Sequence, residues 1–296
     1  MCGSTRPILQ LALREFELNR KESGRMYQQH WGLNRPPFST TGKRFFQSES
    51  QQEALARVEY LVGANRRLGL LVGAEGVGKT TTMEFAWRRA HRSGSPTVYL
   101  NLLGLDEQEF VLTLAEKLGT PMNATAPPVQ AWRRIFDSMA SNRYQNRKTL
   151  ILLDDAHEAD SDVLSAVARM VQWKPSENSG VTTILSTANE RHELIGQRLL
   201  ELCDLAIEVT PWEHADTESF LRGSLEAAGS AESVFDADAI DTIQEISRGV
   251  PRRIAQLAEL ALVAGAGADV DSVDEELVLA VNDELRLPMD VSSPAM

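Results

Sequence analysis

The spacing of apolar and polar positions changes character along this chain near residue 211. Before that point, short apolar runs recur between amphipathic stretches, a pattern typical of strands that alternate with helices. Strands are predicted at 68–72, 97–101, 150–153, 181–187 and 205–209. Because apolar strands bounded by helices are buried on both faces, the pattern predicts a parallel sheet of five strands flanked by helices.

Apolar residues spaced three or four positions apart predict the helices. In the first part of the chain they are predicted at 50–64, 80–91, 106–118, 130–139, 160–173 and 190–202. After Pro211 the strand signals stop, and helices are predicted at 217–228, 237–247, 251–264 and 273–285. The chain is therefore expected to form an α/β domain followed by a small helical domain.

We divide the chain into four segments on this pattern. They are an N-terminal arm at 1–25, the α/β domain at 26–211, the helical domain at 212–287 and a tail at 288–296. The arm has a short amphipathic stretch at 8–16 that fits a helix, and the denser pattern begins at Met26. No apolar run is long enough to predict a membrane span.

Composition narrows the function classes. The chain has 42 acidic and 30 basic side chains and a formal net charge of −12, which argues against a nucleic-acid binder that uses its whole surface. A local basic patch stays compatible with this charge. Its two cysteines are too few for a disulfide framework, so a cytoplasmic location is the expectation.

A glycine-rich segment between the first strand and the next helix matches the pattern G-x-x-x-x-G-K-[ST]. In a strand, turn and helix context this pattern predicts a loop whose backbone N–H groups hold phosphate oxygens. Lys79 is predicted to reach the β- and γ-phosphates, and the Thr80 hydroxyl to bind Mg²⁺. The predicted nucleotide-binding residues here are Gly73, Ala74, Glu75, Gly76, Val77, Gly78, Lys79, Thr80 and Thr81.

Two carboxylates follow the third predicted strand. Asp154 is predicted to support Mg²⁺, and Asp155 to orient or deprotonate the attacking water. The alternative is that both acids only cap the next helix. A phosphate-binding loop upstream favours the catalytic interpretation.

Polar residues at two further places are candidates for contact with the γ-phosphate region. Thr187 and Asn189 follow the fourth predicted strand, where they either hold the attacking water or form a turn before the next helix. Arg252 lies in the first turn of a helix that Pro251 opens. Because a cation is unfavourable at that end of a helix, Arg252 is expected to have an anion nearby, such as a nucleotide phosphate. The alternative is an exposed arginine that contacts only solvent.

These landmarks together resemble the AAA+ ATPases, specifically those of the general secretion pathway protein A (ExeA) type and the related transposition ATPases. The resemblance covers about 26–286 and includes Trp31-Gly32-Leu33, Pro37-Phe38 and Gly249-Val250-Pro251-Arg252. It implies a P-loop NTPase fold with a helical lid, and ATP and Mg²⁺ as cofactors. It also implies that Trp31 and Phe38 lie near the adenine, that Thr187 or Asn189 is sensor 1, and that Arg252 is sensor 2.

The sequence departs from that family in three places. Asp155 stands where the family usually has glutamate. Leu202-Cys203-Asp204 replaces the arginine common before the fifth strand, so Arg198 is the nearest candidate for an arginine finger between subunits. The transmembrane helix and peptidoglycan-binding module of the full-length secretion proteins do not occur in this sequence, so we do not expect the secretion role to transfer with the fold.

The expected function is Mg²⁺-dependent ATP hydrolysis that couples nucleotide state to the conformation of the lid or of a partner. A homo-oligomer or a partner protein is expected. One alternative is a DNA-associated ATPase of the transposition type, although the net charge does not favour DNA. The other is a nucleotide switch that hydrolyses ATP weakly.

Overall fold

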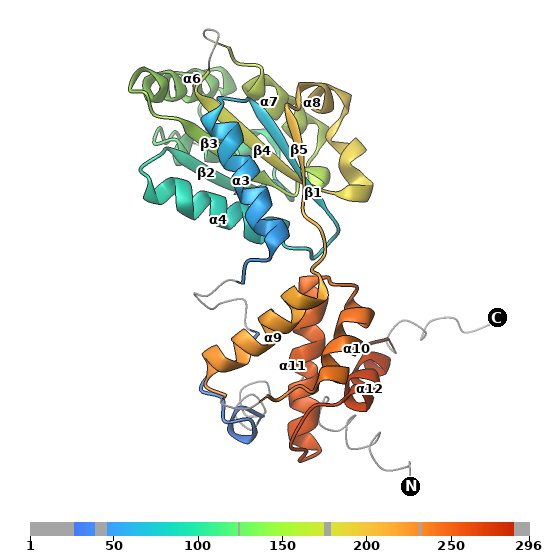
Figure 1. Cartoon of the computed structure of the whole chain (residues 1–296). Coiled ribbons are helices and arrows are strands. Elements are labelled where there is room, and N and C mark those ends of the chain that lie inside the picture. Colours follow the sequence, from blue (N-terminus) through green and yellow to red (C-terminus); the bar gives the residue numbers. More distant parts are fainter. Residues whose placement is uncertain (1–26, 39–45, 124, 175–178, 231–232, 287–296) are drawn as a thin grey trace, which may run out of the picture. The chain divides into compact units, whose positions relative to one another are not determined.

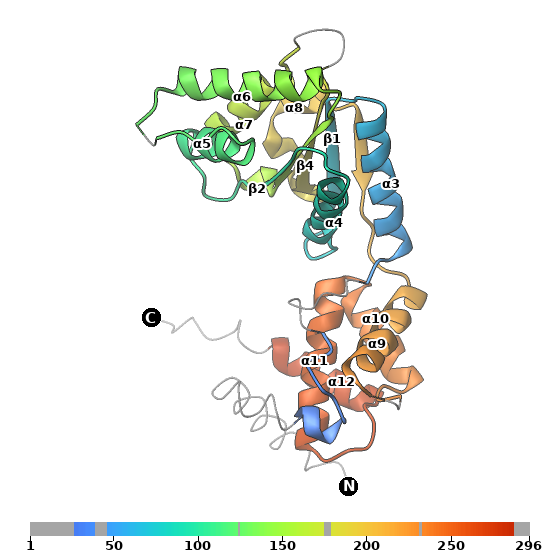
Figure 2. The ribbon, with the colours of Figure 1, turned by 90° about the vertical axis from the view of Figure 1, so that its left-hand side faces the viewer.

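The chain divides into two compact units. One is Glu49–Thr210, and the other combines Met1–Ser48 with Pro211–Met296. The computed structural model describes residues 27–38, 46–123, 125–174, 179–230 and 233–286, so the expected arm and tail lie outside the described residues. Figures 1 and 2 show the sheet-containing unit and the all-helical unit from two directions.

The first unit contains the five-stranded sheet that the sequence predicts. Its strands run parallel in the order β2-β3-β4-β1-β5. Because they are all parallel, their carboxyl ends meet at one edge of the sheet and their amino ends at the other. The strands are β1 (Leu68–Gly73), β2 (Thr97–Asn101), β3 (Thr149–Asp154), β4 (Val181–Ala188) and β5 (Leu205–Glu208).

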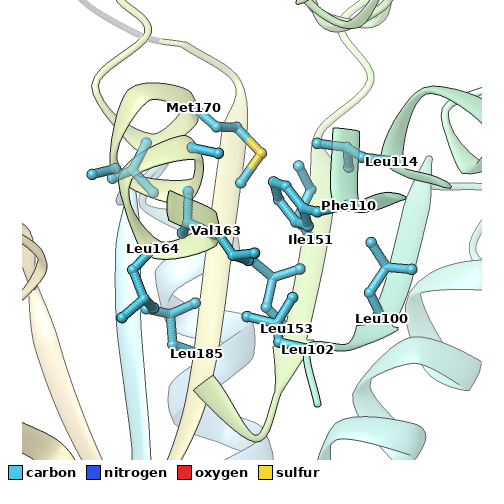
Figure 3. Packing of buried hydrophobic residues seen from close by; sticks show 14 of the residues in the cluster. Leu100, Leu102, Phe110, Leu114, Ile151, Leu153, Val163, Leu164, Met170 and Leu185 are labelled. Carbon is cyan, nitrogen blue, oxygen red and sulfur yellow. The ribbon is translucent and has the colours of Figure 1, made fainter. Parts of the chain in front are cut away.

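Helices cover both faces of this sheet because successive strand residues point to opposite sides. On β3, Leu150 and Leu152 pack in a cluster with α3 and α4, whereas Ile151 and Leu153 pack in a second cluster with α5 to α8. Figure 3 shows Ile151 and Leu153 among side chains of α5 and α7. The helices are α3 (Glu49–Gly63), α4 (Lys79–Arg92), α5 (Glu107–Lys117), α6 (Pro128–Tyr144), α7 (Ser161–Val171) and α8 (Gln197–Leu202).

The prediction of one continuous helix at 190–202 is wrong. The segment forms a 3-10 helix, η2 (Asn189–Ile195), and then the short α8, with Gly196 between them. Gly196 has a φ of 84°, so it cannot continue a right-handed helix through this point. The apolar residues of the two pieces are spaced as they would be in one helix, so the spacing does not reveal the break.

The second unit is all-helical, which confirms the predicted C-terminal helical region. Its helices are α9 (His214–Ala228), α10 (Ala237–Ser247), α11 (Pro251–Gly267) and α12 (Glu275–Arg286). They share one apolar core, in which Leu257, Leu262 and Val278 are fully or almost fully buried. Within the described ranges of the chain, no helix is both long enough and apolar enough to cross a membrane.

Residues 27–38 pack in the core of the helical unit, although the sequence places them with the α/β domain. The Trp31 indole N–H donates a hydrogen bond to the Leu262 carbonyl (2.8 Å), and Asn34 N donates to the Ala228 carbonyl (2.7 Å). The Phe38 ring packs against the rings of Phe220 and Phe235. Because α9 and α11 supply the apolar surface that these rings need, this segment belongs to the helical unit.

Candidate nucleotide-binding site

A tight loop joins β1 to α4 at the carboxyl edge of the sheet. Gly78, its last residue, has a φ of 105°, a left-handed conformation that L side chains rarely adopt. A Cβ atom at Gly78 would also collide with the amide of Gln51, which is buried beneath the loop. The loop therefore needs glycine here. Directly after it, the first backbone N–H groups of α4 form the positive end of a helix.

The Lys79 side chain folds back over this loop. Its Nζ atom donates to the carbonyl oxygens of Gly73 and Ala74, both at 2.9 Å, and the residue is buried. Thr80 is exposed and Thr81 is half-buried in the first turn of α4. The ammonium is thus held above the loop by neutral oxygens, which a phosphate oxygen can replace. This arrangement fits a polyphosphate ligand.

Asp154, the last residue of β3, is buried and held by hydrogen bonds. Tyr99 Oη donates to its Oδ2 atom (2.8 Å), and Ser186 Oγ and the Asp155 N–H donate to its Oδ1 atom. Burial and the adjacent Asp154 carboxylate raise the pKa of Tyr99, so its hydroxyl stays protonated and donates. The Oδ2 atom accepts one of these hydrogen bonds, so it has a further lone-pair direction to offer a cation or a water molecule.

Asp155 begins the turn after β3, in a left-handed conformation with φ 53°. Its Oδ2 atom accepts a hydrogen bond from Asn101 Nδ2 (2.8 Å). The Asn101 Oδ1 atom in turn accepts from the Leu103 N–H (2.8 Å), which fixes the orientation of the amide. The last residue of β2 therefore orients the second carboxylate.

The donor set fits a magnesium ion that binds together with a nucleotide. Mg²⁺ prefers oxygen ligands and is commonly held by one or two carboxylates together with substrate phosphates. Asp154 and the exposed Thr80 hydroxyl supply protein oxygens of this kind. No group of three or more His, Cys, Asp and Glu residues in the described part of the chain could hold a metal by itself. Phosphate oxygens would therefore have to complete the coordination.

Comparisons with known proteins agree with this geometry. Residues 63–195 match the family model described as AAA domain. We refer to these matched residues as the AAA domain. General secretion pathway protein A of Aeromonas hydrophila is 27% identical over 247 residues. The match covers 81% of this chain and 45% of that protein, so the chain spans less than half the length of this relative.

Solved structures of AAA+ proteins share the fold. The Aeropyrum pernix ORC2 protein in ADPNP and ADP complexes has a TM-score of 0.64 at 16% identity, covering 84% of this chain and 72% of that one. The Thermotoga maritima RuvB Holliday junction branch migration motor has a TM-score of 0.56 at 15% identity, covering 85% and 74%. The predicted resemblance to AAA+ ATPases and the P-loop fold are therefore confirmed.

Within the AAA domain, Ser186 is the hydroxyl residue of β4 that touches the first carboxylate. Thr187, the next residue, points to the opposite face, and its buried hydroxyl lies 3.3 Å from the Ala188 carbonyl oxygen. Asn189 is exposed at the start of η2. The sensor 1 role of Thr187 or Asn189 stays a prediction.

Arg191 links three segments at the carboxyl edge of the AAA domain. From η2, its guanidinium pairs with Glu158, which follows β3, and lies 3.9 Å from the carboxylate of Glu75 in the phosphate loop. The predicted loop residue Glu75 is therefore an ion-pair partner on the rim of the loop. Arg198, the candidate finger, is exposed on α8 and donates to Gln172 Oε1 (2.8 Å).

The segment that carries Arg252 belongs to the helical unit. Gly249 has a φ of 72°, and a Cβ atom there would collide with the Trp212 carbonyl oxygen, so glycine is required before α11. Pro251 then begins the helix and Arg252 is exposed in its first turn. No hydrogen bond or ion pair joins Arg252 to another described residue, whereas Arg253 donates to Asn282 Oδ1 (2.8 Å). The sensor 2 role of Arg252 stays a prediction.

Trp31 and Phe38, the predicted adenine contacts, are both buried in the helical unit. They are only 7% and 8% exposed, and their rings pack against residues of that unit. These contacts explain both aromatic residues as core residues. Contact with adenine stays a prediction.

Sequence reasoning missed four residues that hold the site together. Tyr99 and Ser186 donate to Asp154, Asn101 donates to Asp155, and Gln51 lies beneath Gly78. Two of them carried a usable signal, because Asn101 and Ser186 are polar residues near the carboxyl ends of the two strands beside β3. Tyr99 and Gln51 carried none, because the fold alone brings them to the site.

Proposed function

We propose that this chain is a Mg²⁺-dependent ATPase that couples its nucleotide state to the conformation of its helical unit or of a partner. The observation that supports this most is the pairing of the Lys79 loop with two differently held carboxylates at one edge of the sheet. Lys79 and the first turn of α4 would hold the phosphates. Thr80 and Asp154 would hold Mg²⁺, which neutralises phosphate charge when bound.

Asp155 would orient the attacking water and accept its proton at a carboxylate oxygen. Asn101 keeps that carboxylate in place, since its amide is itself fixed by the Leu103 N–H. The reaction consumes ATP and water and yields ADP and inorganic phosphate. The cytoplasmic location and the homo-oligomer or partner protein expected from the sequence stay predictions.

Two alternatives follow from particular observations. The Asp155 side chain is one methylene shorter than glutamate, which favours a nucleotide switch with weak hydrolysis. Similarity to the fold of Aeropyrum pernix ORC1 in complex with DNA, with a TM-score of 0.62 at 17% identity, is compatible with a DNA-associated ATPase. Arg88 and Arg89, two adjacent arginines of α4, form ion pairs with Glu84 and Glu59, so this basic pair does not favour that alternative.

Steady-state phosphate release by the purified chain tests the proposal. We expect release with ATP and Mg²⁺, and none above background when EDTA removes the ion. Addition of DNA separates the DNA-associated alternative, which requires stimulation. Nucleotide binding without any release above the no-protein blank would contradict the ATPase and favour the switch.

The two carboxylates should have separable roles. We expect Asp155→Asn to slow turnover by about 10²–10⁴-fold, the usual contribution of a general base, while nucleotide affinity is unchanged. Asp154→Ala should instead weaken the Mg²⁺ dependence of nucleotide binding, because it removes a ligand of the ion. Titration of a fluorescent ATP analogue against Mg²⁺, together with phosphate release, measures both effects.

A matched control is Asp162→Asn, which removes an exposed acid from the first turn of α7. That variant should behave like the wild type in both measurements. Equal losses of affinity in the Asp154 and Asp155 variants, with turnover at saturation unchanged in both, would contradict the separation of roles.

A further inference from the structure

The parallel sheet brings all of its helix-to-strand connections to one edge, opposite the phosphate loop. These connections enter β1, β2, β3, β4 and β5 at their amino ends. Adjacent strands lie about 4.8 Å apart, so the edge is roughly 19 Å across. The described residues of these connections therefore lie along one edge of the sheet, which we call the amino edge.

The described residues of the amino edge are rich in cations. Asp204 is the acidic residue among the described parts of these connections, and its Oδ2 atom already accepts from the backbone N–H groups of Arg67 and Leu68 (2.8 and 3.1 Å). Glu177 lies in the connection to β4, outside the described residues. The cations in the connections are Arg66, Arg67, Arg147, Lys148 and Lys174.

Few of these cations are neutralised. Among the described residues, Arg66 has a carboxylate partner, Asp204, at a long 3.7 Å. Arg147 and Lys148 donate to the backbone carbonyl oxygens of Gly94 and Gly63, which are neutral. In a chain of net charge −12, positive groups that do not pair with the abundant acids create a local positive potential.

The opposite edge, which carries the phosphate loop, has the reverse charge. Its strand-to-helix connections contain Arg191 and a set of carboxylates. The charge of the α/β unit is therefore positive at the amino edge and negative at the opposite edge. The carboxylates are Glu75, Asp106, Asp155, Glu158, Asp160, Glu190 and Glu193.

The amino edge is also hollowed. A cavity of about 360 Å³ opens there, lined by Arg66, Arg67 and Lys174 together with Asn65, Ser179 and Asp204. Its lining offers guanidinium, ammonium and amide donors around one acid that the backbone already engages. Such a lining fits the oxygens of a phosphodiester group.

We infer that the amino edge binds the phosphate backbone of a nucleic acid. One phosphate occurs per about 3.4 Å of axis on each strand, so the edge can meet several phosphates at once. Tyr144, the last residue of α6, is 91% exposed directly before the connection to β3 and provides a ring on which a base can stack. The inference does not depend on ATP hydrolysis, because the phosphate loop lies at the other edge.

An anionic lipid surface shares the phosphate chemistry but fits the amino edge less well. Peripheral membrane binding needs an apolar face that inserts beside the cations. Among the described residues of this edge, Tyr144 is the large apolar side chain that is well exposed. Arginine, which recognises phosphate through a fork of N–H donors, also outnumbers lysine in the connections.

Fluorescence anisotropy with labelled single-stranded and duplex DNA tests this inference in the full chain. We expect Arg66→Gln/Lys174→Gln to weaken binding by roughly 10-fold and to reduce the salt slope by about 1 for each lost phosphate contact. The matched control, Arg133→Gln/Arg134→Gln, removes the same charge from two exposed arginines near the start of α6, and should retain wild-type affinity. Circular dichroism establishes that both variants fold.

Three results would overturn the inference. They are no binding of either DNA by the wild type at low salt, equal weakening by both double variants, and binding to phosphatidylserine vesicles without binding to DNA. Lys79→Ala distinguishes this inference from the proposed function, because that variant should lose nucleotide binding and still bind DNA at the amino edge. Loss of both together would overturn the separation of the two edges.

Discussion

Replacement of Lys79 by alanine should abolish both nucleotide binding and hydrolysis while the protein stays folded. In the structure Lys79 Nζ donates to the Gly73 and Ala74 carbonyl oxygens of its own loop, so the contacts that alanine removes here are local ones. Its removal takes away the one lysine of the phosphate loop. Less positive charge would then remain to offset the carboxylates at this edge, which repel a polyphosphate.

Isothermal titration with a non-hydrolysable ATP analogue measures this loss directly. Lys117→Ala, which removes an exposed lysine from α5, is the matched control and should bind like the wild type. A thermal melt of Lys79→Ala should agree with that of the wild type to within a few degrees. Wild-type affinity in the Lys79 variant would mean that the loop does not hold the phosphates.

Much of the fold could be predicted because the sheet is buried on both faces. Leu150 to Leu153 form an uninterrupted apolar run, and such runs identify the strands of a parallel sheet without any knowledge of their order. The loop of Gly73 to Thr80 could be located for a related reason. Left-handed dihedrals and close packing against Gln51 admit only glycine at Gly78, so the sequence carries the constraint.

The remainder depended on contacts between distant segments. Trp31 and Phe38 are buried against α9 and α11 rather than in the α/β unit, and no local pattern distinguishes those two destinations. The same difficulty applied to predicting the site, because Tyr99 reaches Asp154 only through the register of β2 beside β3. Gly196 breaks a helix that its flanking apolar residues predict, since spacing reports a buried face and not backbone continuity.

The charge at the carboxyl edge has a consequence for catalysis. Glu75 lies in the phosphate loop, and Asp155 and Glu158 follow β3 at the same edge, so tight binding of a polyanion there would need cations from elsewhere. Lys79 and the start of α4 supply part of that charge, and Mg²⁺ would supply more. Within the AAA domain, Arg191 is already engaged by Glu158 and Glu75. A further arginine would therefore have to come from another position or another subunit.

Arg198 is the candidate that the sequence offers for this role. AAA+ ATPases commonly carry an arginine just before the fifth strand. Here Cys203 and Asp204 precede β5 instead. Asp204 is committed to backbone N–H groups of β1 and the residue before it, so this position contributes to the sheet. Arg198 is exposed on α8, and its guanidinium makes one hydrogen bond, to Gln172, among the contacts of the described residues.

We expect Arg198→Ala to lower turnover by about 10³–10⁵-fold, the measured range for arginine fingers in P-loop enzymes, with nucleotide binding intact. Mixing Arg198→Ala with Lys79→Ala should then restore part of the activity that neither has alone. In a head-to-tail assembly of equal, randomly placed subunits, about a quarter of interfaces would pair an intact loop with an intact Arg198.

Arg133→Ala, on α6, is the matched control and should hydrolyse ATP normally. Phosphate release that is unchanged in Arg198→Ala at every protein concentration would show that Arg198 is not the finger. The weakly hydrolysing switch would then be the better description of this chain.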